Sequence, residues 1–327
     1  MLKTVPVCTT GHVEPVNLSL SQFLDRNGLN APYLISAETH FGPLVEEFGE
    51  VLERQNSTQI IGINGCQGSG KSTLADYLCT RVASEFNVTA VPLSLDDFYL
   101  TKAQRQKISQ EIHPLLATRG VPGTHDIQLA IDTINRLKTS EKTHITRFDK
   151  STDDRIPDAD SSLVQGPVGL IVIEGWCFGA EPVHQRELLT PSNDLESQHD
   201  TDGVWRQYVN NALAGDYQTL FNMADRLVML AAPSFDRVFK WRLEQEKKLI
   251  ETLTPNNNGR LASKTMDEEE ITHFIEYFQR ITEHCLLNVP GKADHLYRLN
   301  NDRSVCNAKA VRQSKASIDS RAERLAD

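Results

Sequence analysis

The stretch IIGINGCQGSGKS, residues 60–72, decides the fold of this chain. Its first part, Ile60–Asn64, is short and mostly apolar, which is typical of a buried parallel strand. Its second part fits the phosphate-binding pattern G-x-x-x-x-G-K-[ST] at every fixed position. Apolar residues then recur at four-residue steps, as in a helix that packs against a sheet. Strand, glycine-rich loop and helix together predict a nucleotide-phosphate site.

The chemistry of phosphate binding gives the residues of this loop their expected roles. Glycines let the backbone turn tightly with its N–H groups inward, and the helix that follows adds its positive dipole end. Lys71 brings a charge to the β- and γ-phosphates, and Ser72 offers a hydroxyl to Mg²⁺. The predicted nucleotide-binding residues are Gly65, Cys66, Gln67, Gly68, Ser69, Gly70, Lys71, Ser72 and Thr73. Cys66 is either a small residue that fits the loop or a redox sensor activated by the dipole.

Acidic residues follow two further predicted strands. Asp96 and Asp97 come at the end of residues 88–95, and Glu174 ends the apolar run 168–173. Ligands of parallel sheets bind at the carboxyl ends of strands, so these carboxylates can face the γ-phosphate. One of them can accept a proton, and Glu174 is expected near Mg²⁺, as in a Walker B strand. The bland alternatives are an Asx turn for the aspartates and a surface acid for Glu174.

Composition excludes several classes of protein. The formal net charge of -10 makes the chain a poor general binder of nucleic acid. Its six cysteines fit neither a CxxC pair nor a zinc pattern, which favours free thiols in a reducing compartment. We find no apolar run long enough for a membrane helix and no secretory h-region, so a cytoplasmic protein is expected.

The alternation of strands and helices predicts the fold class. It indicates an α/β fold with a mostly parallel sheet and helices on both faces. Further strands are expected at 144–148, 226–231 and 295–299, and helices at 126–138, 234–253 and from a capping box at 265–268 onward. We divide the chain into a helical N-terminal extension (1–55, with helices at 19–29 and 43–52), a main domain (56–300) and a polar tail (301–327). The tail is expected to be mobile or only loosely docked. Two polar stretches, 190–203 and 254–264, are expected to be loops or insertions.

The order of the motifs carries a resemblance. A P-loop, then D-x-F-Y at 96–99, then an apolar strand ending in Glu-Gly resembles the superfamily of phosphoribulokinase, uridine kinase and pantothenate kinase. A narrower resemblance, over residues 58–300, is to the plant and fungal type of D-glycerate 3-kinase. It is carried by DDFYLT (96–101), RGVPGTHD (119–126), RFDKS (147–151) and EGW (174–176). It implies a P-loop kinase domain that uses Mg²⁺ and ATP to convert D-glycerate to 3-phosphoglycerate.

The resemblance also implies roles for single residues. The implied catalytic residues are Asp96, Lys71 and Glu174, and the implied metal ligands are Ser72, Asp97 and Glu174, with Asp97 the alternative base. The implied substrate residues are Asp96, Tyr99, Arg119, His125, Asp126 and Arg147. Arg237 and Arg242 would form a basic lid within the helix at 234–253. A cluster of Arg147, Asp149, Lys150 and Arg155 would border the substrate pocket.

Each of these roles has a structural alternative. Asp126 can cap the helix that follows it, His125 can be purely structural, and Arg119 can be a surface charge. The residues of the 147–155 cluster and the lid arginines can be solvated. The sequence departs from the plant pattern in two places. Gly65 stands where a small non-glycine residue is expected in the plant form, and a polar insertion follows Leu189. The insertion leaves the ATP site untouched but bears on the acceptor. The acceptor can therefore be another small molecule, such as pantothenate, a nucleoside or a different sugar acid. A regulatory NTPase that acts on a protein partner is the remaining alternative.

Overall fold

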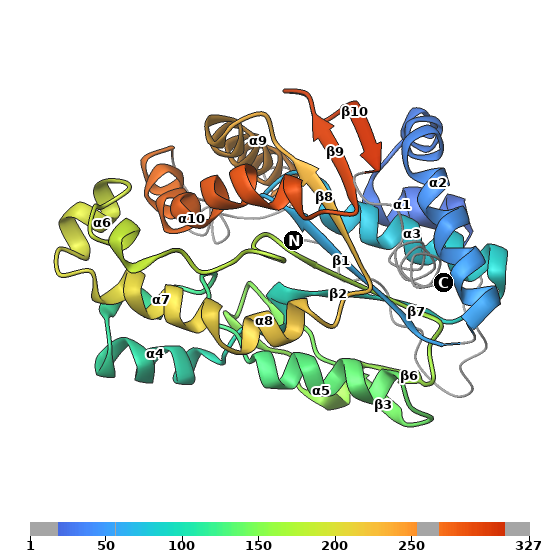
Figure 1. The fold of residues 1–327 in the computed structure, drawn as a ribbon, viewed down its shortest axis with the longest axis horizontal. Coiled ribbons are helices and arrows are strands. Elements are labelled where there is room, and N and C mark those ends of the chain that lie inside the picture. Colours follow the sequence, from blue (N-terminus) through green and yellow to red (C-terminus); the bar gives the residue numbers. More distant parts are fainter. Residues whose placement is uncertain (1–18, 56, 254–267, 311–327) are drawn as a thin grey trace, which may run out of the picture.

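A single six-stranded sheet organises the structure, a computed structural model that describes residues 19–55, 57–253 and 268–310. The strand order is β10-β9-β8-β1-β7-β2 (Figure 1). The strands are β1 (Gln59–Gly65), β2 (Ala90–Ser94), β7 (Leu170–Gly175), β8 (Arg226–Ala231), β9 (His295–Leu299) and β10 (Val305–Ala310). All neighbours pair in parallel except β10, which is antiparallel to β9. The predicted fold class, a mostly parallel sheet, is confirmed.

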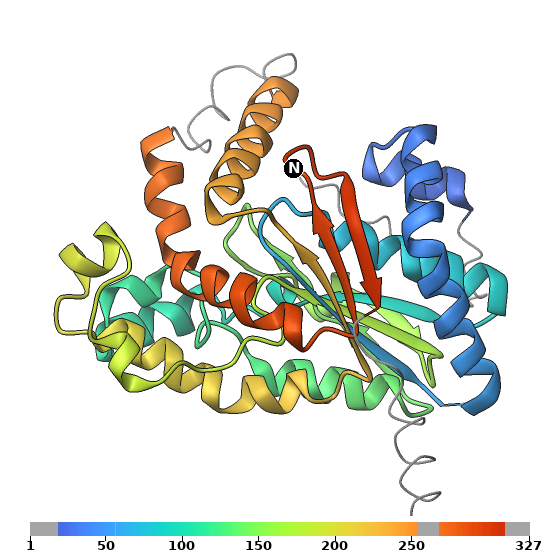
Figure 2. The same cartoon turned by 45° about the horizontal axis from the view of Figure 1, so that its top comes forward.

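Helices cover both faces of this sheet (Figures 1 and 2). In β7, Leu170 and Val172 point into one core, and Ile171 and Ile173 point into the other, as the period of a strand requires. The first core packs under α1 (Leu20–Asn27), α2 (Ala31–Gln55), α3 (Lys71–Phe86) and α9 (Phe235–Leu253). The second core packs under α5 (Ile127–Leu137), α7 (Val204–Ala214), α8 (Asp216–Phe221) and α10 (Glu268–Asn288).

The N-terminal helices differ from the prediction in one boundary. The first helix begins after a Ser19 capping box and ends at Gly28 in the left-handed region, close to its predicted bounds. The second was expected at 43–52, from the helix-like spacing of its apolar residues. It begins at Ala31 instead and carries Pro43 in its interior. Burial of Leu44 and Phe48 in the first core accounts for a helix that continues through a proline.

The segment between α5 and β7 does not join the main sheet. One strand was expected at 144–148, but the structure has β3 (Lys142–Ile145) paired with β6 (Ser162–Gln165) and a separate hairpin of β4 (Phe148–Asp149) and β5 (Asp154–Arg155). Both pairs are antiparallel. Helix α4 (Lys102–Glu111) precedes this region, and 3₁₀ turns cover Leu95–Phe98, Pro114–Ala117, Asp158–Asp160, Gln185–Leu188 and Val289–Gly291.

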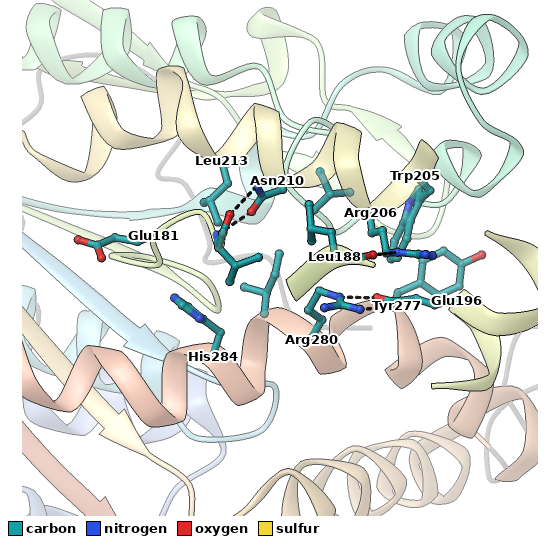
Figure 3. A pocket seen from close by; sticks show the side chains of 13 residues that line it. Glu181, Leu188, Glu196, Trp205, Arg206, Asn210, Leu213, Tyr277, Arg280 and His284 are labelled. Atoms are coloured by element: carbon teal, nitrogen blue, oxygen red, sulfur yellow. Dashed lines mark hydrogen bonds and ion pairs between the residues drawn. The ribbon is translucent and has the colours of Figure 1, made fainter. Parts of the chain in front are cut away.

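The polar stretch 190–203 is docked and partly helical, contrary to the prediction of a loop. It contains α6 (Asp194–His199), and the Arg280 guanidinium on α10 donates to Glu196 at 2.8 Å from Nε to Oε1. Figure 3 shows this pair beside a cavity of about 20 Å³ between α7 and α10, which is room for about one water molecule. The acids of this stretch look solvated in the sequence, but Glu196 pairs with Arg280 of α10 and Asp200 pairs with Arg206 of α7.

The tail from residue 301 onward was expected to be mobile or only loosely docked, and within it Val305–Ala310 forms the edge strand β10. Its side chains are mostly exposed, so its sequence has little of the apolar pattern by which a strand is recognised. The predicted loop at 254–264 and the first residues of the predicted capping box, 265–267, lie outside the described residues. Within the described ranges, no helix combines the length and apolar character needed to cross a membrane.

Candidate active site

The glycine-rich loop connects β1 to α3, whose first residue is Lys71. Gly68 and Gly70 have φ angles of 78° and 92°, which L side chains rarely adopt. A Cβ atom at Gly65 would lie 2.5 Å from the Ser69 hydroxyl oxygen, so a larger residue there would shift the loop. The loop therefore has the tight turns that a phosphate-binding backbone needs, at the positively polarised end of a 16-residue helix.

Glu174 gathers polar groups at the end of β7. Its Oε1 accepts hydrogen bonds from Ser72 Oγ at 2.6 Å and from Ser94 Oγ at 2.9 Å. Its Oε2 lies 3.7 Å from Lys71 Nζ and is buried without a hydrogen-bond partner. The structure thus brings together three predicted residues, Lys71, Ser72 and Glu174. Ser94 was missed, although its place at the carboxyl end of β2 could have indicated it.

The charges of two carboxylates hold the Lys71 ammonium in its ionised form. Burial lowers the pKa of Lys71, but the negative charges of Glu174 and Asp96 raise it by more. The net shift of the pKa is therefore upward. In the same loop, burial raises the pKa of the Cys66 thiol to about 12, against the pull of Lys71. Cys66 is therefore a neutral thiol at pH 7, which favours the reading of a small residue that fits the loop over that of a redox sensor.

Asp96 follows β2 in a 3₁₀ turn and has two close partners. Its Oδ1 accepts from the Tyr99 hydroxyl at 2.8 Å, and its Oδ2 lies 2.6 Å from Lys150 Nζ. Burial raises the pKa of Asp96, but the ammonium groups of Lys150 and Lys71 lower it more, so it stays well below its ordinary value. Asp96 is therefore ionised, and its charge acts on the P-loop lysine.

Asp97 has other partners. Its Oδ2 accepts from the Arg147 guanidinium at 2.6 Å, and its Oδ1 accepts from the Phe148 N–H at 3.3 Å. Burial raises the pKa of Asp97 against the opposing effect of Arg147. The expected metal set of Ser72, Asp97 and Glu174 is thus divided, because Ser72 and Glu174 contact each other while Asp97 holds Arg147.

His125 stacks on Tyr99, the residue whose hydroxyl contacts Asp96. Its ring stacks on Tyr99 with 4.5 Å between centroids, and its Nδ1 is 2.5 Å from the Tyr217 hydroxyl. Its Nε2 is buried without a partner. Burial lowers the pKa of His125 to about 4, although the charge of Asp96 opposes this shift, so the imidazole is neutral at pH 7. Tyr217, on α8, was missed because its contact spans 92 residues.

Asp126 and Arg119, the other two predicted substrate residues of the RGVPGTHD block, each form an ion pair. Asp126 accepts from the Leu129 N–H at 3.1 Å and so caps α5, which is the structural alternative for this residue. Its second oxygen accepts from Arg155 at 3.0 Å. Arg119 pairs with Asp153 and lies 5.6 Å from the centroid of the Phe148 ring. Neither residue is a freely solvated charge.

The β4–β5 hairpin delivers positive charge to these acids. Of the four residues singled out there, Arg147 reaches Asp97, Lys150 reaches Asp96 and Arg155 reaches Asp126. Asp149 instead stabilises the turn by accepting from the Ser151 N–H at 2.8 Å. Three members of the cluster, Arg147, Lys150 and Arg155, are therefore ion-paired to acids of the candidate site, although Lys150 remains largely exposed. The pairing joins residues 29 to 54 positions apart, which local patterns do not reveal.

Arg303, which was not among the predicted lid residues Arg237 and Arg242, contacts the P-loop. Arg242 on α9 lies 5.7 Å from the Phe274 ring centroid, and Arg237 is partly buried in the first turn of the same helix. The P-loop is contacted by Arg303 instead, whose Nε donates to the Gly68 carbonyl at 2.9 Å. Arg303 also lies 2.7 Å from Glu244 of α9 and 5.2 Å from the Trp241 ring centroid. It therefore connects the phosphate loop to the helix predicted to carry the lid.

Comparison with known proteins places this site in a family. No protein-family model matches the chain. "Uncharacterized kinase mug58" of Schizosaccharomyces pombe is 33% identical over 248 residues, which cover 72% of this chain and 85% of mug58. The chloroplastic D-glycerate 3-kinase of Arabidopsis thaliana is 29% identical over 233 residues, 67% of this chain and 46% of the plant protein, so the chain spans about half of that relative.

A solved structure gives the same fold. The D-glycerate 3-kinase of Cryptococcus neoformans superposes with a TM-score of 0.68 at 23% identity, and the match covers 84% of this chain and 99% of that one. The likeness of fold extends over nearly the whole fungal enzyme. Of the three proteins named, mug58 has the highest sequence identity to this chain. The chain therefore belongs to the family of ATP-dependent P-loop kinases that includes mug58, and it is a phosphotransferase that acts on an alcohol group of a small molecule.

Proposed function

We propose that this kinase transfers the γ-phosphoryl group of ATP to the 3-hydroxyl of D-glycerate and produces 3-phosphoglycerate and ADP. The observation that carries the proposal is the Lys150–Asp96 ion pair at 2.6 Å, within a group of cationic side chains from the β4–β5 hairpin. Positive charge beside a candidate base suits an acceptor that carries a carboxylate. The D-glycerate 3-kinase of Arabidopsis, with its 29% identity, supports the same acceptor.

The residues of the site suit distinct steps of phosphoryl transfer. In the proposed reaction Asp96 accepts the proton of the acceptor hydroxyl, and Lys71 binds the phosphate oxygens on which negative charge builds up. His125, a neutral imidazole with an unpartnered buried Nε2, is suited to a hydrogen bond with the acceptor. Asp97 positions Arg147 rather than binding a metal.

The residues around Glu174 fit Mg²⁺. The buried Glu174 Oε2 lacks a hydrogen-bond partner, and the Ser72 hydroxyl lies on the other oxygen of the same carboxylate. Among the described residues, no three His, Cys, Asp or Glu side chains form a metal site by themselves. This suits Mg²⁺, which prefers one or two protein oxygens together with phosphates and waters. When bound, Mg²⁺ would neutralise charge on the β- and γ-phosphates.

The acceptor is tested by ADP release from Mg-ATP with D-glycerate, L-glycerate, pantothenate, uridine or no acceptor. We expect D-glycerate to stimulate turnover far above the acceptor-free rate, and pantothenate and uridine to have little effect. Stronger stimulation by pantothenate or uridine would move the proposal to another acceptor. An acceptor-independent ATPase that a protein partner stimulates would replace it with a regulatory role.

Arg303→Ala is expected to raise the Kd for ATP about tenfold, with a smaller change in the KM for the acceptor. The reason is the loss of a charged donor to the Gly68 carbonyl, which fixes the phosphate loop. Isothermal titration with ATP measures the change. Arg298→Ala, in the exposed part of the neighbouring strand β9, is the matched control and should bind ATP normally. An unchanged Kd in Arg303→Ala would mean that the contact does not support the loop.

A further inference from the structure

The exposed side of Asp96 is occupied by Lys150. The Tyr99 side chain on Oδ1 belongs to a residue that is 4% exposed, whereas the Lys150 side chain on Oδ2 is 44% exposed. The Asp96 side chain itself is 29% exposed. An acceptor arrives from solvent, so its hydroxyl must approach Asp96 from the side where Lys150 now lies. A general base must come within hydrogen-bond reach of the proton that it removes.

Lys150 is placed so that its head group can move while the hairpin stays fixed. It follows β4 at the tip of the hairpin, whose turn is held by the contacts of Asp149 with Ser151. The base of the same hairpin is anchored by Arg147 on Asp97 and by Arg155 on Asp126. A lysine ammonium on a flexible four-carbon stem can swing between two anions without a change of backbone.

We propose that Lys150 recognises the carboxylate of the acceptor and, by turning to it, uncovers Asp96 for the acceptor hydroxyl. This inference rests on the proposed function, since it requires an acceptor that is a small hydroxy acid. The hydroxyl proton passes to Asp96 Oδ2, the hydroxyl oxygen forms a bond to the γ-phosphorus, and the bond to ADP breaks. A neutral polyol has no anion to offer, so it leaves the ammonium on the base.

The other cations near the site cannot make the same exchange. Arg119 is paired with Asp153, Arg147 with Asp97, and Arg155 with Asp126. Moving Arg147 or Arg155 to an acceptor carboxylate would take the ion pair from Asp97 or Asp126, and moving Arg119 would leave Asp153 to Arg105 alone. None of these moves would uncover Asp96. Among the ion pairs of the described residues, the Lys150–Asp96 pair is the one whose exchange couples recognition of the acceptor's charge to access to the candidate base. The enzyme should therefore select acids over neutral analogues through this one side chain.

The test compares D-glycerate with its neutral analogue glycerol in wild-type, Lys150→Met and Lys150→Arg enzymes. In Lys150→Met we expect kcat/KM for D-glycerate to fall about 30-fold, the worth of a charge-assisted hydrogen bond. Turnover with glycerol, and with water in the acceptor-free ATPase reaction, should rise, because Asp96 is no longer covered. Lys150→Arg should keep most of the preference for the acid. Lys142→Met, an exposed lysine on β3, is the matched control and should behave as wild type.

A parallel loss of activity with D-glycerate, glycerol and water in Lys150→Met would overturn the inference, since it would mean a structural role for the lysine. Retention of the wild-type preference for the acid would overturn it as well. The proposed function fails separately, if the wild-type enzyme does not use D-glycerate. The same comparison then uses pantothenate and its neutral alcohol panthenol, with the same two outcomes for Lys150.

Discussion

Asp96→Asn is expected to lower kcat for phosphoryl transfer by about a thousandfold, within the usual contribution of a general base. Asparagine has nearly the same shape and can still contact Tyr99 and Lys150, but it cannot accept the acceptor's proton. The Kd for ATP should change by less than about threefold, because the phosphate loop is untouched. ADP release and isothermal titration with ATP measure the two quantities.

Asp97→Asn is the matched control for this experiment. Asp97 is the adjacent carboxylate, but it contacts Arg147 and the Phe148 N–H instead of Lys150. We expect a smaller loss of kcat in this variant than in Asp96→Asn. Full turnover by Asp96→Asn, or a larger loss in Asp97→Asn, would assign the base to a residue other than Asp96.

Lys71→Met is expected to lower kcat by about a thousandfold and to weaken ATP binding as well. The Lys71 ammonium lies 3.7 Å from Glu174 Oε2, the negative charges of Glu174 and Asp96 raise its pKa, and it is the cation of the loop itself. Its removal takes away charge stabilisation on the transferred phosphoryl group. Single-turnover measurements at saturating ATP separate the effect on chemistry from the effect on binding.

A control lysine tests whether charge alone matters. Lys102→Met, at the exposed start of α4, changes the net charge equally and should leave kcat unchanged. Lys71→Arg should not restore activity, because the guanidinium is larger and planar and the loop is tightly turned around this position. Near-normal kcat in Lys71→Met would show that another cation balances the phosphate charge.

The parts of the site that could be predicted from the sequence are those whose chemistry lies in one contiguous stretch. The P-loop at 65–73 has its strand, glycines and helix in consecutive residues, and the structure has the same order. Glu174 was predicted to lie near Ser72 because strands of a parallel sheet present their carboxyl ends together, and β1 pairs with β7. The roles of these residues in catalysis remain predictions.

The remaining contacts were missed because they join distant segments. Lys150 reaches Asp96 across 54 residues, Tyr217 reaches His125 across 92, and Arg303 reaches Gly68 across 235. Each of these residues is polar and, in the sequence alone, equally consistent with a solvated loop. Arg303 in particular lies in the tail expected to be mobile or only loosely docked, and its position depends on the pairing of β10 with β9 and on contacts with Gly68 and Glu244.

The errors in the fold have the same origin. Burial of one face allowed α2 to run through Pro43, against the local preference of proline. Pairing of charges allowed the polar stretch 190–203 to dock on α10. In both cases tertiary contacts overrode a local signal. The alternation of strands and helices was predictable because the five parallel strands of the sheet are apolar and visible in the sequence.

Identification of the product by ³¹P NMR, after the enzyme is incubated with Mg-ATP and D-glycerate, tests the proposed phosphorylation of D-glycerate. We expect the signals of 3-phosphoglycerate and ADP to appear in equal amounts as ATP is consumed. Inorganic phosphate and ADP without a phosphorylated acceptor, or no consumption of ATP, would contradict the claim that this chain is a D-glycerate 3-kinase.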